Sequence, residues 1–131
     1  MAIDMMSQPN ITNLISGTVV SDLELTNAGE IDPYFGGHRK LMVTVYRPIT
    51  GTCRPGSRPY MPPTTVDHMA PLLESMGFEH MSDHLKKLTL PVCHLPEEHD
   101  HLASYPILLF SHGLNSSRLL SSIQAQTVAM H

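Results

Sequence analysis

The sequence has little of what directs a chain to a membrane or an export pathway. The first lysine or arginine is Arg39, so the early positive charge of a secretory signal or a transit peptide is missing. The longest uninterrupted apolar stretch runs only from Ile107 to Phe110, far short of the roughly 20 residues that span a bilayer. These absences predict a cytoplasmic chain without a transmembrane segment, although a parent protein with a longer amino terminus would be compatible with secretion.

The charge and the cysteine content exclude further classes of protein and of binding partner. Eight Lys and Arg stand against twelve Asp and Glu, a net charge of -4, and this balance gives no basic surface for a phosphate backbone. We therefore expect no nucleic-acid partner. Cys53 and Cys93 are too few for a disulfide framework, so one bridge and two free thiols both remain open. The absence of tryptophan and the abundance of proline and glycine disfavour a compact helical bundle.

The first half of the chain predicts an antiparallel hairpin. Residues 1–14 are polar and aperiodic, which is typical of a frayed terminus. Residues 18–25 alternate, with Val19, Leu23 and Leu25 on the face expected to be buried. Residues 39–47 are rich in β-branched side chains and end at a proline. We expect these two strands to pair at the edge of a sheet.

The middle of the chain predicts an irregular loop and two helices. Residues 48–63 are proline-rich and are expected to form an extended loop. Helical spacing predicts helices over 66–76 and 79–88, and a short strand over 88–95 follows. Methionines in this region fill a core or form a plastic apolar surface. They are Met61, Met69, Met76 and Met81.

The last thirty residues predict a buried strand, a sharp turn and a helix. Tyr105-Pro106-Ile107-Leu108-Leu109-Phe110 is an apolar run of strand length, as in the centre of a parallel sheet. Ser111-His112-Gly113-Leu114-Asn115 is expected to turn, and Ser116 or Ser117 to cap a helix that reaches Met130. A parallel partner strand would have to come after that helix.

This block resembles the platelet-activating-factor acetylhydrolase family of serine esterases. In that family a Pro-initiated strand runs into Ser-His-Gly-Leu, with an Arg, here Arg118, near the start of the next helix. Asp32-Pro33, the segment 39–48 and Tyr60-Met61-Pro62-Pro63 are similar to the amino-terminal section of the fungal-type members. The resemblance covers about residues 15–131. It implies the α/β class: the amino-terminal part of an α/β-hydrolase fold, incomplete, with an edge hairpin, a helical insert, the first central strand and its following helix.

The resemblance also implies an oxyanion hole. Acyl transfer builds an oxyanion that preorganised backbone N–H groups must stabilise. The Leu114 amide is the expected donor, Gly113 permits the bend, and His112 and Asn115 shape the loop. His112 is not the triad base, because the base follows the nucleophile in this family.

The nucleophile is missing from these 131 residues, since no serine has a glycine two positions before it. We expect 15–131 to be a partial domain without catalytic residues of its own, inactive alone and prone to non-specific self-association through exposed apolar surface. By resemblance, the parent hydrolyses an ester or phospholipid substrate without a cofactor, in lipid breakdown.

A small metal-binding or interaction module is the alternative from another class. His80 and His84 stand four apart on an expected helix, and a His/Cys-rich segment follows. It contains Cys93, His94, His99 and His101. No Cys-x-x-Cys is present, and adjacent Cys93 and His94 do not easily share one tetrahedral site, so no metal site is predicted.

Overall fold

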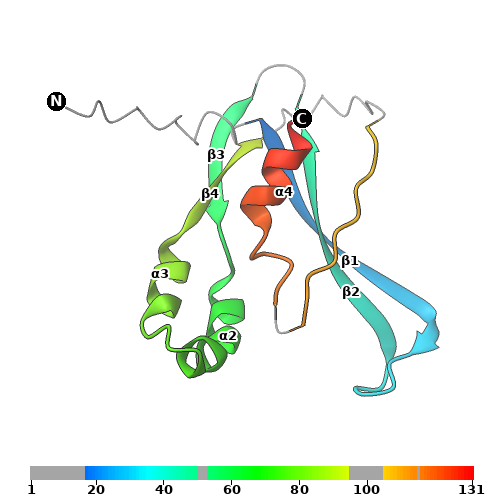
Figure 1. Cartoon of the computed structure of the whole chain (residues 1–131). Coiled ribbons are helices and arrows are strands. Elements are labelled where there is room, and N and C mark those ends of the chain that lie inside the picture. Colours follow the sequence, from blue (N-terminus) through cyan, green and yellow to red (C-terminus); the bar gives the residue numbers. More distant parts are fainter. Residues whose placement is uncertain (1–16, 50–52, 95–104, 115) are drawn as a thin grey trace.

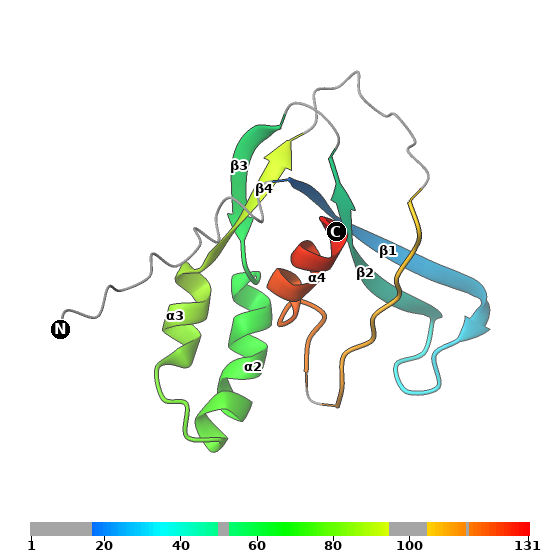
Figure 2. The same cartoon turned by 45° about the horizontal axis from the view of Figure 1, so that its top comes forward.

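A computed structural model describes residues 17–49, 53–94, 105–114 and 116–131. Two two-stranded antiparallel sheets stand on either side of a carboxyl-terminal helix, α4 (Ser122–Ala129), and two further helices lie at the foot of one sheet (Figures 1 and 2). None of the helices in these ranges is long and apolar enough to cross a membrane.

The first hairpin confirms the predicted strand pair. Strand β1 (Thr18–Ile31) pairs with β2 (His38–Pro48) in register from Thr18↔Pro48 to Asn27↔Arg39. The predicted inward face is wrong, however. Thr18 is fully buried and Val20 packs against the core, whereas Leu23 and Leu25 are about half exposed.

A second antiparallel strand pair occupies part of the expected loop. Strand β3 (Arg54–Pro59) pairs with β4 (Thr89–His94), so the prediction of no regular element over 48–63 is wrong. Tyr60 N donates to Leu88 O at 2.9 Å, and hydrogen-bonded pairs alternate along an antiparallel ladder. The prolines of this ladder therefore fall at the positions that need no N–H. They are Pro55, Pro59 and Pro91.

A disulfide lies at one end of this second strand pair. Cys53 is bonded to Cys93, with the two Cα atoms 5.3 Å apart, which settles the alternatives that the sequence left open. Cys93 is buried in the ladder opposite Pro55. The bridge joins two cysteines that are 40 positions apart in the chain, and both middle helices lie between them.

The helices form close to where their patterns predict. Helix α2 (Pro63–Ser75) begins with proline at its first position and contains Pro71; α3 (Met81–Lys87) follows Gly77. Three of the four methionines pack in or against the core, while Met76 is exposed. The buried core unites β4, α2 and α3 with the two residues that follow β3 and with the turn before α4. It consists of Tyr60, Met61, Val66, Leu85, Leu90, Val92 and Leu119.

The expected central strand is absent. Residues 105–110 form no strand and make no backbone hydrogen bond to other described residues. Ile107 and Leu109 are 87% and 89% exposed, the opposite of burial on both faces. A strand is fixed by hydrogen bonds from neighbouring chains, and the described part of the molecule places none beside this segment.

The expected fold class is therefore wrong for this structure. The described strands form two two-stranded antiparallel sheets and no parallel pair. The arrangement is not the amino-terminal part of an α/β-hydrolase fold, because the described residues contain no buried parallel strand.

Candidate functional site

The loop after the apolar segment is the candidate site. It lies on the surface, with the Leu114 side chain 96% exposed. His112 Nδ1 lies 3.0 Å from the Gly113 carbonyl oxygen, a hydrogen bond that an Nδ1-protonated imidazole donates. Apart from Gly113 and its two chain neighbours, no heavy atom of the described residues lies within 4 Å of where a Cβ on Gly113 would stand. The backbone of this loop is therefore open to a ligand on its Gly113 side.

The Leu114 amide is the group on which the site depends. Ser116 N donates to Gly113 O at 3.2 Å, which closes a tight turn around position 114. The N–H of Leu114 has no acceptor within the ranges that the structure describes. An exposed amide donor in a closed turn is able to bind an anion or an oxyanion. Asn115, named with this loop from the sequence, lies outside the described residues.

The carboxyl-terminal side of the loop is anchored firmly in the molecule. Leu119 is 2% exposed and belongs to the core, and Ser117 Oγ accepts a hydrogen bond from its N–H at 3.3 Å. The predicted cap is wrong, because α4 (Ser122–Ala129) begins later and Ser121 precedes it without a side-chain cap. Ser117 instead stabilises the turn that leads into the helix.

Arg118 joins the loop to the first hairpin. Its Nε donates to Thr44 Oγ1 at 2.9 Å, and its Nη2 lies 3.9 Å from the carboxylate of Asp22. The same carboxylate accepts hydrogen bonds from Thr44 and Arg58, each at 2.7 Å. Burial alone would raise the pKa of Asp22, but these hydrogen bonds and the two guanidinium charges outweigh it and hold the pKa below its ordinary value. Asp22 is therefore an ionised anchor for the loop.

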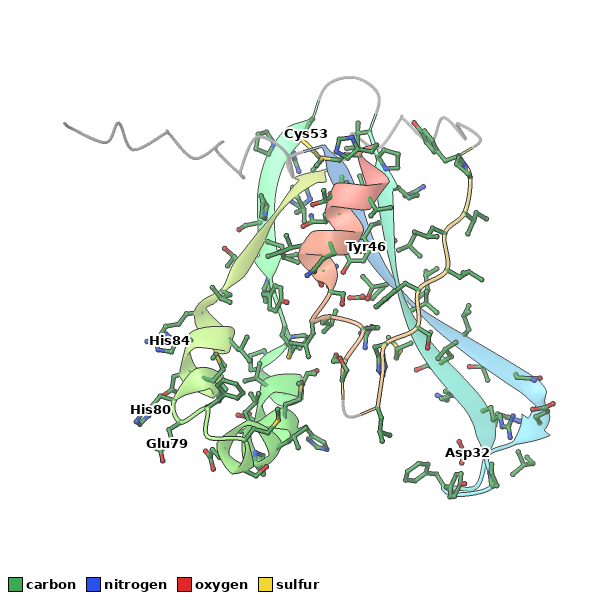
Figure 3. The ribbon with its side chains drawn as sticks, viewed as in Figure 1. Asp32, Tyr46, Cys53, Glu79, His80 and His84 are labelled. Carbon is green, nitrogen blue, oxygen red and sulfur yellow. A yellow bond between two sulfur atoms is a disulfide. The ribbon has the colours of Figure 1, made fainter. Side chains whose placement is uncertain are left out.

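A second polar group lies between the hairpin and α4. Tyr46 points toward α4 (Figure 3) and donates to Ser122 Oγ at 2.7 Å, and Ser122 donates to Leu119 O at 2.6 Å. Tyr60 donates to Leu120 O at 2.7 Å. Burial raises the pKa of both tyrosines, so both stay protonated donors at neutral pH. Ser122 is fully buried and already bonded, so it is not available as a nucleophile.

The histidines do not build a metal centre in the described part of the chain. No three His, Cys, Asp or Glu side chains converge there. His80, which precedes α3, and His84 within it are exposed to solvent (Figure 3), and Cys93 is oxidised in the disulfide. His99 and His101 lie outside the described residues.

Sequence reasoning singled out the loop but missed what holds it. Arg118 was noted only for its position near the next helix, and its ion pair with Asp22 joins residues far apart in the chain. The alternation of β1 did place Asp22 and Thr18 on one face. That face, opposite the one expected to be buried, is the one that contacts α4.

Comparison with known proteins adds no relative. No family model, no curated protein and no solved structure matches the chain.

Proposed function

We propose that this chain supplies the oxyanion loop of a serine carboxylic-ester hydrolase of the platelet-activating-factor acetylhydrolase type. The observation that carries the proposal is the exposed Leu114 amide, which has no acceptor among the described residues and sits in a turn anchored through Leu119 and Arg118. The proposal rests on this loop and on the Ser-His-Gly-Leu resemblance. It does not depend on the arrangement of the sheets.

The proposed chemistry is acyl transfer. A serine oxygen attacks the ester carbonyl carbon while the general base takes the serine proton and so becomes the general acid. The carbonyl π electrons move to oxygen, and the tetrahedral intermediate carries an oxyanion. When the intermediate collapses, the alcohol leaves and takes a proton from the general acid; water then releases the acyl group. The Leu114 N–H would donate to the oxyanion in both steps. One such donor is worth about 10² to 10³ in turnover.

The remaining catalytic groups must come from outside these 131 residues. The chain contains no Gly-x-Ser-x-Gly motif, and its buried Ser122 is bonded to Tyr46 and Leu119. The chain alone therefore has no route to an acyl-enzyme. Its role in the proposal is to hold one donor in place, with no cofactor required by the mechanism.

A loop graft tests this proposal. Residues 105–118 of this chain would replace the corresponding block of an active fungal-type platelet-activating-factor acetylhydrolase, and hydrolysis of a short-chain ester would be followed. We expect the graft to retain turnover within about tenfold of its parent. The parent supplies every other catalytic group, and the grafted loop has only to place the Leu114 N–H beside the oxyanion. A second graft, with Leu114→Pro, should lose activity because proline has no backbone N–H to donate to the oxyanion. A folded but inactive first graft would refute the proposal.

A further inference from the structure

The Cys53–Cys93 disulfide lies at the end of the β3–β4 strand pair that is farther from α2 and α3 (Figure 3). Cys93 is 2% exposed, whereas Cys53, which comes just before β3, is partly exposed. Thiol–disulfide exchange begins when a thiolate attacks an accessible sulfur. A thiol in solution is therefore expected to attack at Cys53 and to displace Cys93.

The β3–β4 strand pair depends on this bridge. Strands β3 and β4 are each six residues long, and among the described residues they pair only with each other. Two-stranded antiparallel pairs are marginally stable in water by themselves. Closing a loop as long as the one between the two cysteines favours the folded state by on the order of a thousandfold. We therefore expect this strand pair to open much more often once the bridge is reduced.

Polar contacts lead from β3 to the candidate loop. Arg58 on β3 donates to the carboxylate of Asp22 at 2.7 Å, and the same carboxylate lies 3.9 Å from Nη2 of Arg118. Tyr60, just after β3, donates to Leu120 O at 2.7 Å. Arg118 and Leu120 both lie in the segment that joins the loop to α4. The position of β3 therefore affects how firmly this segment is held.

Strand β4 holds the same segment from its apolar side. Leu90 and Val92 of β4 belong to the buried core that contains Leu119. Gln126 of α4 donates from Nε2 to Pro91 O at 2.9 Å. Opening of the strand pair would therefore loosen the polar and the apolar anchors of the loop together.

We infer that the Cys53–Cys93 disulfide is a redox-sensitive switch for the candidate oxyanion loop: the oxidised bridge holds the loop in place, and a dithiol reductant releases it. The inference rests on the proposed function, because it concerns the loop that carries the Leu114 amide. An oxyanion donor is effective only when it is held in position before the reaction. Reduction therefore lowers turnover without changing any group that contacts the substrate.

The chemical step is a two-electron exchange with a dithiol. One thiolate of the reductant attacks Sγ of Cys53, the bond to Sγ of Cys93 breaks, and Cys93 leaves as a thiolate that takes up a proton. The second thiolate of the reductant attacks its own sulfur in the mixed disulfide, and Cys53 leaves and is protonated in turn. The reductant ends as a disulfide, and the protein gains two electrons and two protons.

Hydrogen exchange on the whole chain tests the inference. Leu120 N donates to Ser117 O at 3.1 Å, and its exchange reports on the segment that follows the loop. Ser122 N, which donates to Leu119 O at 3.2 Å, is a second reporter. With dithiothreitol at neutral pH, we expect both cysteines of the folded chain to become open to alkylation. Exchange at the two reporters should then be at least about tenfold faster, with about a thousandfold as the limit set by loop closure.

Two sets of variants provide the controls. The Cys53→Ser/Cys93→Ser variant should exchange like the reduced chain and should not respond to dithiothreitol. Tyr60→Phe removes the donor to Leu120 O and should speed exchange at Leu120 about two- to tenfold in the oxidised chain. The matched variant Tyr34→Phe removes the hydroxyl of a side chain that is 88% exposed and should leave this exchange unchanged.

Residues 23–27 of β1 separate a switch from a purely structural bridge, because they lie in a different strand pair that contains no cysteine. Their exchange should change less than about twofold on reduction. The inference is overturned if the folded chain keeps its bridge in dithiothreitol or if the reporters Leu120 and Ser122 do not accelerate. It is also overturned if residues 23–27 accelerate as much as the reporters, since reduction would then unfold the whole chain.

These outcomes are independent of the loop graft. Hydrogen exchange needs no turnover, so a bridge that does not control the loop would remove this inference and leave the proposed function standing. An inactive graft would remove the esterase proposal and leave the redox release of the loop intact.

Discussion

Breaking the Cys53–Cys93 disulfide should destabilise the protein strongly. The bridge joins residues 40 apart and encloses β3, α2, α3 and most of β4, so it removes much of the freedom of the unfolded chain. For a loop of this length, the loss of loop-closure entropy corresponds to about 4 kcal/mol at 25 °C. That amount is comparable to the whole stability of a small domain, for which 5–15 kcal/mol is typical. Reduction should therefore leave the β3–β4 strand pair barely folded.

Urea unfolding measures this effect. The Cys53→Ser/Cys93→Ser variant should unfold at a much lower urea concentration than the oxidised chain, and the chain treated with a reductant should behave like the variant. The reductant should have no effect on the variant, which serves as the control. If the reduced chain unfolds at the same urea concentration as the oxidised chain, the assignment of the bridge as a structural constraint is refuted.

Three further predictions concern single features. The carboxylate of Asp22, with a folded pKa below its ordinary 3.8, stabilises the protein above that pH and less as the pH falls through the folded pKa. Asp22→Asn should therefore lower the melting temperature at pH 7, and the difference between the two proteins should shrink as the pH falls through the folded pKa of Asp22. Gln126 is fully buried and its Nε2 donates to Pro91 O at 2.9 Å, so Gln126→Ala should cost about 1–3 kcal/mol in chemical unfolding, and an unchanged midpoint would argue against the bond. Ile107→Ser/Leu109→Ser should lower the self-association measured by analytical ultracentrifugation, because it removes exposed apolar surface; equal association constants would place the sticky surface elsewhere.

Local patterns predicted the elements that local interactions decide. The β1–β2 pairing follows from alternation and from Pro48, and α2 and α3 appear within a few residues of their predicted bounds. The prediction of which face of β1 is buried was wrong because it used the apolar side chains alone and left out hydrogen bonds to other elements. Thr18 turns inward instead, since Gln126 donates a hydrogen bond to its hydroxyl from α4.

Long-range pairing explains the larger errors. Arg54–Pro59 becomes a strand because it pairs with β4, some 30 residues later in the chain. The register of this pair places all three prolines at positions where the ladder needs no backbone N–H. Residues 105–110 carry a strong strand pattern yet stay unpaired, because burial requires neighbours that the pattern does not supply. At the candidate site, the sequence singled out Gly113 and Leu114, whose role stays a prediction, and it did not indicate that Arg118 is anchored on Asp22.

The turnover of Leu114 variants tests the central claim most directly. In an esterase carrying residues 105–118 of this chain, Leu114→Pro deletes the N–H, whereas Leu114→Ala keeps it and removes only the exposed side chain. We predict that kcat falls about 10² to 10³-fold in the proline variant and stays within a few-fold in the alanine variant. Equal turnover in a correctly folded proline variant would show that Leu114 does not bind the oxyanion.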